Sequence, residues 1–306
     1  MARGVSVHVG VNRARPSFQM TELRGCVKDA EAMRQIAIAY NFEAQPVLAD
    51  HNATFQAVKN AIKAANTPRL TNGDIFLFTF SGHGSTAPTA INEDDGQDET
   101  ILLHDCVLID NYFRRNLWSQ FDEGVRILGV ADCCHGGTSL LASFFGHVKD
   151  SIMTVFTGTQ PGNAASGQGR NPRFKELSRA DQNKIRSISP EIHAKIDQEI
   201  LLAGQTMRAT ILTLASCGDF EKALDGEDNG AFTKAMIEVL CNQAPPPNVD
   251  EIVTRIRANP NQPPNYDELK NRIGTNLANK GITTQHPTRA PQNADPAFLG
   301  QVPFTI

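Results

Sequence analysis

Residues 125–138 read VRILGVADCCHGGT, and this stretch decides the fold. It begins as an apolar run and ends in Asp132, two cysteines, a histidine and two glycines. A short apolar run that ends at glycine is typical of a strand buried in a parallel sheet. Open α/β sheets place their chemistry at the carboxyl ends of such strands, so we expect residues 132–137 to line a site.

A second apolar run, at residues 74–85 (DIFLFTFSGHGS), ends in glycines around His83. A thiol and an imidazole at the ends of two core strands can act as a nucleophile and its base, because a cysteine thiol is mostly protonated near neutral pH without such help. His83 lies 51 residues before Cys134. Caspases are known to have these two residues in the same order, about 50 residues apart.

Four segments carry a resemblance to a known family. They are residues 23–30 (LRGCVKDA), 80–84 (FSGHG), 132–137 (DCCHGG) and 215–240 (ASCGDFEKALDGEDNGAFTKAMIEVL). In these segments the chain resembles the metacaspases, the caspase-like peptidases of plants, fungi, protists and bacteria. The segments follow the family's order over roughly two thirds of the chain, which makes a chance match of single motifs a poor explanation. The resemblance implies a caspase-like three-layer sandwich.

The alternation of strand-like and helix-like segments predicts an α/β fold with a mostly parallel central sheet and helices on both faces. We expect strands within residues 4–11, 46–49, 74–85, 125–138 and 210–216, and helices at 26–42, 52–65 (capped by Asn52), 110–121, 140–145, 231–241, 249–258 and 266–278. The proline-containing tail is expected to run extended over the surface.

The resemblance also implies a division of the chain within one integrated domain. Residues 1–146 correspond to a p20-like large subunit, 147–208 to a linker and candidate processing segment, and 209–306 to a p10-like small subunit. We expect no separate prodomain. The family seals the sheet edge through which caspases dimerise, so the resemblance implies a monomer.

Composition excludes several classes of protein. The 306 residues are 40% hydrophobic and 20% charged with a net charge of −4, which is ordinary for a globular protein and argues against nucleic acid as the partner. We find no stretch of 18 apolar residues and no signal peptide, so we expect a cytoplasmic protein without a membrane segment. The six scattered cysteines indicate reduced thiols. Zinc held by Cys133, Cys134 and His135 is an alternative, but neighbours on a strand point to opposite faces.

The resemblance assigns the catalytic residues. Cys134 is the third residue of D-x-C-H-x-G and corresponds to the nucleophile, whereas Cys133 is expected to be a small buried neighbour that points away. His83 would hold the thiol proton and later protonate the leaving amine. The alternative for His83 is a core histidine that only satisfies its hydrogen bonds. The backbone N–H groups of Gly84 and Cys134 are expected to form the oxyanion hole; no third triad member can be named.

The resemblance implies an acidic S1 pocket formed by Cys26, Asp29, Ser81 and Asp132. Two carboxylates in one cleft select a cation, and a guanidinium can be held by both. Asp29 could instead be a solvated acid in the first turn of a helix. We therefore predict a cysteine endopeptidase that cleaves peptides after Arg or Lys. The alternatives are a catalytically silent caspase-like scaffold protein and a legumain-like peptidase that prefers Asn.

The resemblance also raises the question of calcium. In metacaspases an acidic stretch, which corresponds to residues 93–99 here, leads into aspartates that bind regulatory calcium. Asp105 and Asp110 resemble two of these aspartates. Asn111 and Leu141 stand where the family often has two further aspartates. Because calcium takes six to eight oxygen ligands, we expect that no cofactor is required and that calcium activates weakly at most.

Residues 158–171 are rich in Gly, Ser, Asn and Gln, which is typical of a mobile loop, and a basic stretch that we predict to be helical follows them. An exposed loop before basic residues offers a peptidase of this specificity its own substrate, so we predict self-cleavage and a zymogen. The candidate bonds follow Arg170, Arg173, Lys175, Arg179, Lys184 and Arg186. The position of Arg170 favours it, because Arg173 and Lys175 would lie in the helix. The alternative is an ordered flap that is never cut.

Overall fold

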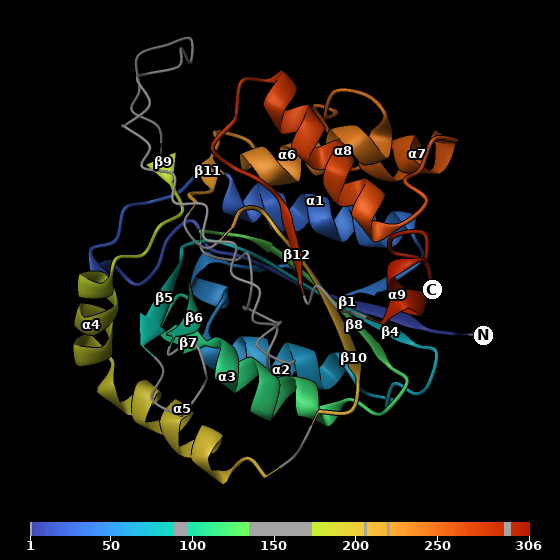
Figure 1. Ribbon diagram of the computed structural model, residues 1–306. Helices are drawn as coiled ribbons and strands as arrows, with labels where there is room; N and C mark the ends of the chain where they lie inside the picture. Colours follow the sequence, from blue (N-terminus) through green and yellow to red (C-terminus); the bar gives the residue numbers. More distant parts are fainter. Residues whose placement is uncertain (1, 89–96, 135–172, 205–206, 219–220, 291–294) are drawn as a thin grey trace, which may run out of the picture.

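A seven-stranded sheet forms the centre of the molecule in the computed structural model, which describes residues 2–88, 97–134, 173–204, 207–218, 221–290 and 295–306. The strand order is β12-β10-β8-β4-β1-β2, and β3 also pairs with β1 (Figure 1). The strands are β1 (Gly4–Gly10), β2 (Glu43–Ala44), β3 (Leu48–Ala49), β4 (Ile75–Ser81), β8 (Arg126–Asp132), β10 (Thr210–Ala215) and β12 (Thr288–Ala290). Only β12 pairs in the antiparallel sense within this sheet, so the predicted mostly parallel sheet is confirmed.

Helices cover both faces of the sheet (Figure 1). One face carries α1 (Cys26–Ala39), α6 (Ala231–Cys241), α7 (Glu251–Ala258) and α8 (Tyr266–Asn279). The other face carries α2 (Phe55–Ala65), α3 (Asp110–Tyr112) and α5 (Pro190–Leu202). In β4, Phe76 and Phe78 pack into one core and Ile75 and Leu77 into the other. Because successive side chains point to opposite faces, a strand buried on both sides is apolar throughout, as the sequence shows.

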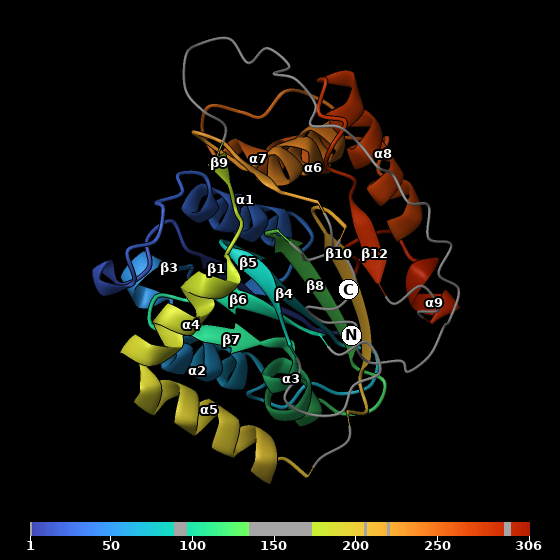
Figure 2. The same ribbon diagram turned by 60° about the vertical axis from the view of Figure 1, so that its left-hand side comes forward.

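Two smaller ribbons lie near the carboxyl ends of the central strands. One consists of β5 (Gly84–Pro88), β6 (Gln97–Leu102) and β7 (Val107–Ile109), and the other of β9 (Arg173–Phe174) and β11 (Leu224–Asp225). The backbone N–H groups of Arg24 and Gly25 donate to the carboxylate of Asp225, which ties β11 to the start of α1. Figure 2 shows the chain passing from β9 toward α4 (Arg179–Ile188).

Several local predictions need correction. The helix expected from Asn52 begins at Phe55, and Thr54 caps it by accepting from the N–H of Ala57. Residues 173–175 are extended rather than helical, because they pair with β11 and the next helix begins only after the cap at Ser178. The tail contains a short helix, α9 (Pro296–Leu299), besides β12. The predicted segment at residues 140–145 and all of residues 147–172 lie outside the described residues.

The predicted helix at 110–121 is present, although its turns change. After α3, residues 113–117 form a π-helical turn and residues 118–120 a 3-10 turn. This segment buries Trp118 against the rings of Phe76, Phe78 and Phe113. Among the helices that the structure describes, none combines the length and apolarity that crossing a bilayer requires.

His8 lies in the middle of β1 and is fully buried. Its Nδ1 is 2.9 Å from the hydroxyl of Thr79 and its Nε2 is 2.9 Å from the hydroxyl of Ser6. Burial lowers the pKa of His8 to about 3, with a smaller contribution from the nearby Arg34. The folded protein therefore holds a neutral imidazole at a pH at which the unfolded chain is already protonated.

Because His8 is buried in its neutral form, we predict that the protein loses stability as the pH falls. Above its ordinary pKa of 6.5 the residue is neutral in both states, but below 6.5 only the unfolded chain binds the proton. The free energy of unfolding should therefore fall by up to about 1.4 kcal/mol per pH unit as the pH drops from 6.5 toward 3. We expect this component to be missing in His8→Gln and present in the exposed-residue control His51→Gln. Denaturant unfolding between pH 7 and 4.5 measures the free energy of unfolding of each protein. If this free energy falls with pH equally in wild type and in His8→Gln, the role of His8 is contradicted.

Candidate active site

Two neighbouring strands and one helix bring the predicted S1 residues together. Ser81 at the end of β4 pairs in register with Asp132 at the end of β8. Asp29 lies in the first turn of α1, and its Oδ2 accepts a hydrogen bond of 2.7 Å from the hydroxyl of Ser81. Cys26, the first residue of α1, is fully buried beside them, and burial raises the pKa of its thiol. Asp29 is buried as well, so it is not the solvated first-turn acid of the alternative interpretation.

The side chain of Lys175 fills the space between these residues. Its Nζ lies 3.0 Å from Oδ2 of Asp29 and 3.1 Å from Oδ1 of Asp132, and it donates a hydrogen bond of 2.9 Å to the hydroxyl of Ser81. Lys175 is fully buried. A lysine is almost never buried to this degree unless its charge is paired. The chain therefore supplies its own cation to the acidic pocket.

The charges of this cluster depend on one another. Burial disfavours the ammonium of Lys175, but Asp132 and Asp29 outweigh it and hold the pKa of Lys175 well above its ordinary value. Burial raises the pKa of Asp132, the proximity of Asp29 adds to this, and the ammonium acts in the opposite direction. Two carboxylates face one ammonium, so the pocket has an excess of negative charge. A pocket of this charge binds a cation strongly.

The amino terminus of α6 closes the pocket. Asp29 Oδ1 accepts hydrogen bonds from the backbone N–H of Gly230 at 2.9 Å and from the amide of Asn229 at 3.0 Å. Asp132 Oδ2 accepts from the hydroxyl of Thr233 at 2.7 Å and from its N–H at 3.3 Å. The first N–H groups of a helix have no partner within the helix and carry partial positive charge. They fix both carboxylates in position and help to stabilise their ionised forms.

Gly230 is a pocket residue to which no sequence pattern pointed. A Cβ atom there would overlap Nζ of Lys175 and would lie 2.6 Å from Oδ2 of Asp132. Only a residue without a side chain leaves room for a long cation at this position. A glycine before a helix is common enough that the residue alone carries no signal of this role.

The backbone of Lys175 is held like an added strand. Its N–H donates to the carbonyl of Ala223 at 3.0 Å, and the preceding β9 pairs antiparallel with β11. Its carbonyl oxygen accepts a hydrogen bond of 2.9 Å from the N–H of Gly84, the residue predicted for the oxyanion hole. A Cβ atom at Gly84 would lie 2.5 Å from the carbonyl oxygen of Cys134, so this approach requires glycine. This pairing is the geometry in which extended peptides bind to a sheet edge.

Cys134 lies next to this backbone. The N–H of Ala223 donates to its Sγ at 3.1 Å, while the carbonyl of the same Ala223 accepts from Lys175. Burial raises the pKa of the Cys134 thiol to about 12, and the N–H of Ala223 acts against this. Cys133 packs into the core on the α2 face, whereas Cys134 packs against Cys217 and Ala223. The two adjacent cysteines therefore face different surroundings, as strand alternation predicts.

Both ring nitrogens of His83 face backbone carbonyls. Nε2 lies 2.8 Å from the oxygen of Thr21 and Nδ1 lies 3.0 Å from the oxygen of Glu176. Burial lowers the pKa of His83, while the two carbonyls act in the opposite direction. A neutral ring can donate to only one of the two oxygens. Thr21 orients the ring through its backbone, which is why no side-chain motif pointed to it.

The other candidates for self-cleavage lie outside the pocket. Arg173 Nη2 is 3.7 Å from Oε1 of Glu227. Glu227 is exposed and also forms an ion pair with Arg24. Arg179 is the first residue of α4. Lys184 and Arg186 lie in α4 as well, and the favoured Arg170 falls outside the described residues. Of these basic residues, Lys175 is the one whose side chain the structure describes between the two carboxylates.

The two predicted calcium ligands have structural partners. Asp105 Oδ1 accepts from the backbone N–H of Phe55 at 2.8 Å and so caps α2, and Asp110 is buried and accepts from the N–H of Asn111. In the described part of the chain, no three His, Cys, Asp or Glu side chains gather closely enough to hold a metal ion. Glu93, Asp94 and Asp95 of the acidic stretch, and His135 of the zinc alternative, fall outside it. Asp105 and Asp110 thus each hold a hydrogen-bond partner within the fold.

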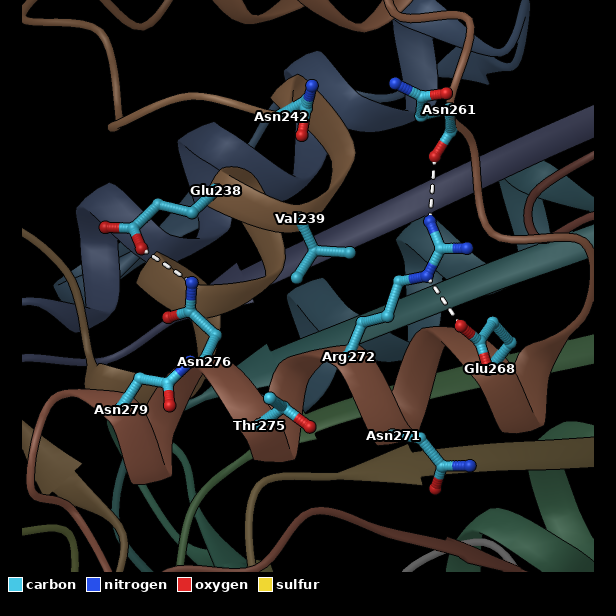
Figure 3. Close-up of a pocket in the computed structure, with 10 residues that line it drawn as sticks. All are labelled: Glu238, Val239, Asn242, Asn261, Glu268, Asn271, Arg272, Thr275, Asn276 and Asn279. Carbon is cyan, nitrogen blue, oxygen red and sulfur yellow. Dashed lines mark hydrogen bonds and ion pairs between the residues drawn. The ribbon is translucent and has the colours of Figure 1, made fainter.

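A surface hollow of about 430 Å³ lies elsewhere, between α6 and α8 (Figure 3). Its polar side chains pair with one another: Arg272 Nε is 2.7 Å from Glu268, and Asn276 Nδ2 is 2.9 Å from Glu238. None of the predicted site residues lines it. The acidic pocket is not a hollow because Lys175 occupies it.

Comparison with known proteins places the chain in a family. The model of the caspase domain matches residues 4–273. This chain belongs to the caspase family. The caspase domain is 24% identical over 245 residues to Metacaspase-1 of Debaryomyces hansenii, covering 74% of this chain and 54% of that protein. It is 25% identical over 246 residues to Metacaspase-7 of Arabidopsis thaliana, covering 74% and 58%. The resemblance seen in the sequence motifs is confirmed.

The match to a solved structure covers more of the chain. The caspase domain aligns with the crystal structure of protein GSU0716 from Geobacter sulfurreducens with a TM-score of 0.69 and 26% identity, covering 99% of both chains. The curated relatives are longer, and the chain spans about half of the length of those it matches.

The buried cluster predicts a large effect of Lys175→Met on stability. Removing the ammonium leaves two buried carboxylates without a counter-charge, which should lower the free energy of unfolding by about 3–5 kcal/mol at pH 7. Burial raises the pKa of Asp132 and the ammonium acts against this rise, so without the ammonium Asp132 takes up a proton more readily and the loss should shrink as the pH falls toward 4. Denaturant unfolding in a Cys134→Ala background measures it, with Lys184→Met in α4 as the control, because the Lys184 ammonium donates to the amide oxygen of the exposed Gln19. Equal losses in the two variants would contradict the role of the ion pairs.

Proposed function

We propose that the chain is a cysteine endopeptidase that cleaves peptide bonds after Lys or Arg and whose own Lys175–Glu176 bond lies in the position of a substrate. One observation carries the proposal: Lys175 has its ammonium between Asp29 and Asp132 while its carbonyl oxygen accepts from the N–H of Gly84. A basic side chain in an acidic pocket and a carbonyl on an oxyanion-hole donor are the two features of a bound substrate.

The chemistry follows from the groups around this bond. The sulfur of Cys134 attacks the carbonyl carbon of Lys175, and its proton passes to His83. The oxygen gains negative charge and is stabilised by the N–H of Gly84. The C–N bond then breaks, and His83, whose Nδ1 already faces Glu176, gives its proton to the departing amine. Water attacks the thioester, releases the carboxylate and restores the thiol.

The arrangement also explains why the enzyme would be kept silent. Lys175 occupies the pocket that a substrate needs, and burial keeps the Cys134 thiol protonated with a pKa of about 12. A thiol with this pKa is almost entirely protonated at neutral pH and reacts slowly. Cleavage after Lys175 would free the pocket and uncover the thiol for a peptide substrate.

The first prediction concerns the nucleophile and its base. Cys134→Ala and His83→Ala should each abolish cleavage of Lys- and Arg-containing peptides, whereas Cys133→Ala should retain most of it because Cys133 faces the α2 core. Peptide hydrolysis followed by mass spectrometry measures the three variants, and unchanged melting curves show that they fold. Activity retained in Cys134→Ala would show that Cys134 is not the nucleophile.

The second prediction concerns the bond that the chain cuts in itself. Purified protein at neutral pH should give fragments of residues 1–175 and 176–306, because the Lys175–Glu176 bond is the one held beside Cys134. Lys175→Arg should still be cut there, since both carboxylates can hold a guanidinium. Lys175→Met and Cys134→Ala should remain intact at this position. Intact-protein mass spectrometry identifies the cleaved bond. A cut after Arg170 alone would contradict cleavage after Lys175 and would support cleavage in the preceding loop.

The third prediction concerns the pocket wall. Gly230→Ala should lower kcat/KM for Lys- and Arg-containing peptides by about 10²-fold or more, because its Cβ displaces the basic side chain from between the carboxylates. Gly204→Ala is the matched control, since a Cβ there meets no atom within 4 Å. Equal kinetics in the two variants would mean that the basic side chain of a substrate binds elsewhere.

A further inference from the structure

Lys222 contacts the two residues that flank Lys175 in the chain. Its Nζ lies 2.7 Å from Oε2 of Glu176 and 5.5 Å from the centroid of the Phe174 ring. Phe174 precedes Lys175 and Glu176 follows it. One ammonium thus reaches from the position before the basic residue to the position after the bond.

The backbone on either side of Lys222 is fixed. Glu221 Oε2 accepts hydrogen bonds from the N–H of Gly218 at 3.1 Å and from the N–H of His286 at 2.8 Å. On the other side of Lys222, the N–H of Ala223 donates to Sγ of Cys134 and the carbonyl oxygen of Ala223 accepts from the N–H of Lys175. Lys222 therefore stands between two anchored neighbours at the edge of the active site. Its side chain is held over the path of any peptide that binds as residues 174–176 do.

We propose that Lys222 is a specificity-determining residue, which selects an acidic residue directly after the cleaved bond and an aromatic residue directly before the basic one. The proposal rests on the proposed function, since it names further subsites of the same cleft. An ammonium attracts a carboxylate, and it also attracts the face of an aromatic ring. The substrates that fit are peptides of the pattern aromatic–basic–acidic, of which Phe174-Lys175-Glu176 is the chain's own example.

The expected preference is modest, because both partners of the ion pair are partly exposed, with side-chain exposures of 49% for Lys222 and 40% for Glu176. Exposed ion pairs and exposed cation–π contacts each correspond to roughly two- to fivefold in a binding constant. The ion-pair share should fall in high salt, because at 1 M ionic strength charges are screened beyond about 3 Å. The contact with the ring should be less sensitive to salt.

Internally quenched peptides with a single basic residue test the proposal. The parent, Ala-Phe-Lys-Glu-Leu-Ser, is compared with one peptide in which Gln replaces Glu and another in which Ala replaces Phe. Wild-type protein should cleave the parent with a kcat/KM about two- to fivefold above each of the others, as estimated from exposed pairs. The difference between Glu and Gln should shrink at 1 M salt.

Variants of Lys222 identify the residue responsible. Lys222→Met should cleave the parent and the Gln peptide equally, and Lys222→Glu should prefer the Gln peptide. Lys195→Met is the matched control: Lys195 lies over the ring of Phe55 at 5.8 Å, but it belongs to α5, which packs with α2 on the other side of the sheet from α1 and α6. This control should keep the wild-type preferences. A structural role of Lys222 would instead lower the cleavage of all peptides by the same factor.

A second measurement needs no catalysis. In the Cys134→Ala background, Lys222→Glu and Glu176→Lys should each lower the free energy of unfolding, and the double variant should recover part of the loss. Recovery supports the pairing of these two residues in the uncut chain, and additive losses would overturn it.

The outcomes separate this inference from the function on which it rests. Cleavage after Lys with equal rates for Glu and Gln peptides, in wild type and Lys222→Met alike, would overturn the role of Lys222 and leave the peptidase intact. Failure to cleave any of the peptides would overturn the peptidase itself, and the inference with it.

Discussion

The ion pairs between the ammonium of Lys175 and the carboxylates of Asp29 and Asp132 organise one end of this molecule. They join residues that lie 146 positions apart in the chain and that come from α1, β8 and the segment after β9. Charges buried this deeply are stable only when each is paired and hydrogen-bonded. The pocket, the start of α6 and the extended segment at 173–177 therefore depend on one another, and a change in any one of them affects the others.

This dependence explains the surroundings of Cys134 and His83. The backbone that delivers Lys175 to the pocket also places its carbonyl on Gly84 and the carbonyl of Glu176 on His83. Cys134 packs against Cys217 and against Ala223, which pairs with the same segment, and its burial raises the pKa of the thiol. A site that is filled by its own chain offers no hollow on the surface. The hollow between α6 and α8 is thus a poor guide to function here.

The sequence predicted the parts of the site that depend on regular structure. Ser81 and Asp132 end two apolar runs, and adjacent parallel strands must bring their carboxyl ends together. Asp29 followed from the resemblance alone, because its place at the start of a helix also fits a solvated acid. Lys175 was among the candidates for cleavage, but the basic stretch around it predicted a helix with exposed charges. What makes it extended is pairing with β11, a contact between segments about 50 residues apart that local pattern cannot express.

Other residues were missed for related reasons. Gly230 matters because of what a Cβ atom would strike, and this depends on a lysine far away in sequence. Thr21 acts through a backbone carbonyl, which every residue type possesses. Lys222 is an ordinary surface lysine until the extended segment lies beside it. Sequence patterns therefore locate the strands and their ends, whereas the groups that tune the cleft are defined only by tertiary contacts.

The central claim is that the pocket of Asp29 and Asp132 accepts a cation, and a scan of the residue before the cleaved bond tests it most directly. Peptides that differ only in having Lys, Arg, Asn, Ala or Asp at this position are compared by kcat/KM on the purified protein. Two buried carboxylates attract a cation and repel a third carboxylate, so we expect cleavage of the Lys and Arg peptides and none of the Asp peptide. Turnover of the Asp or Asn peptide as fast as that of the Lys peptide would contradict the account.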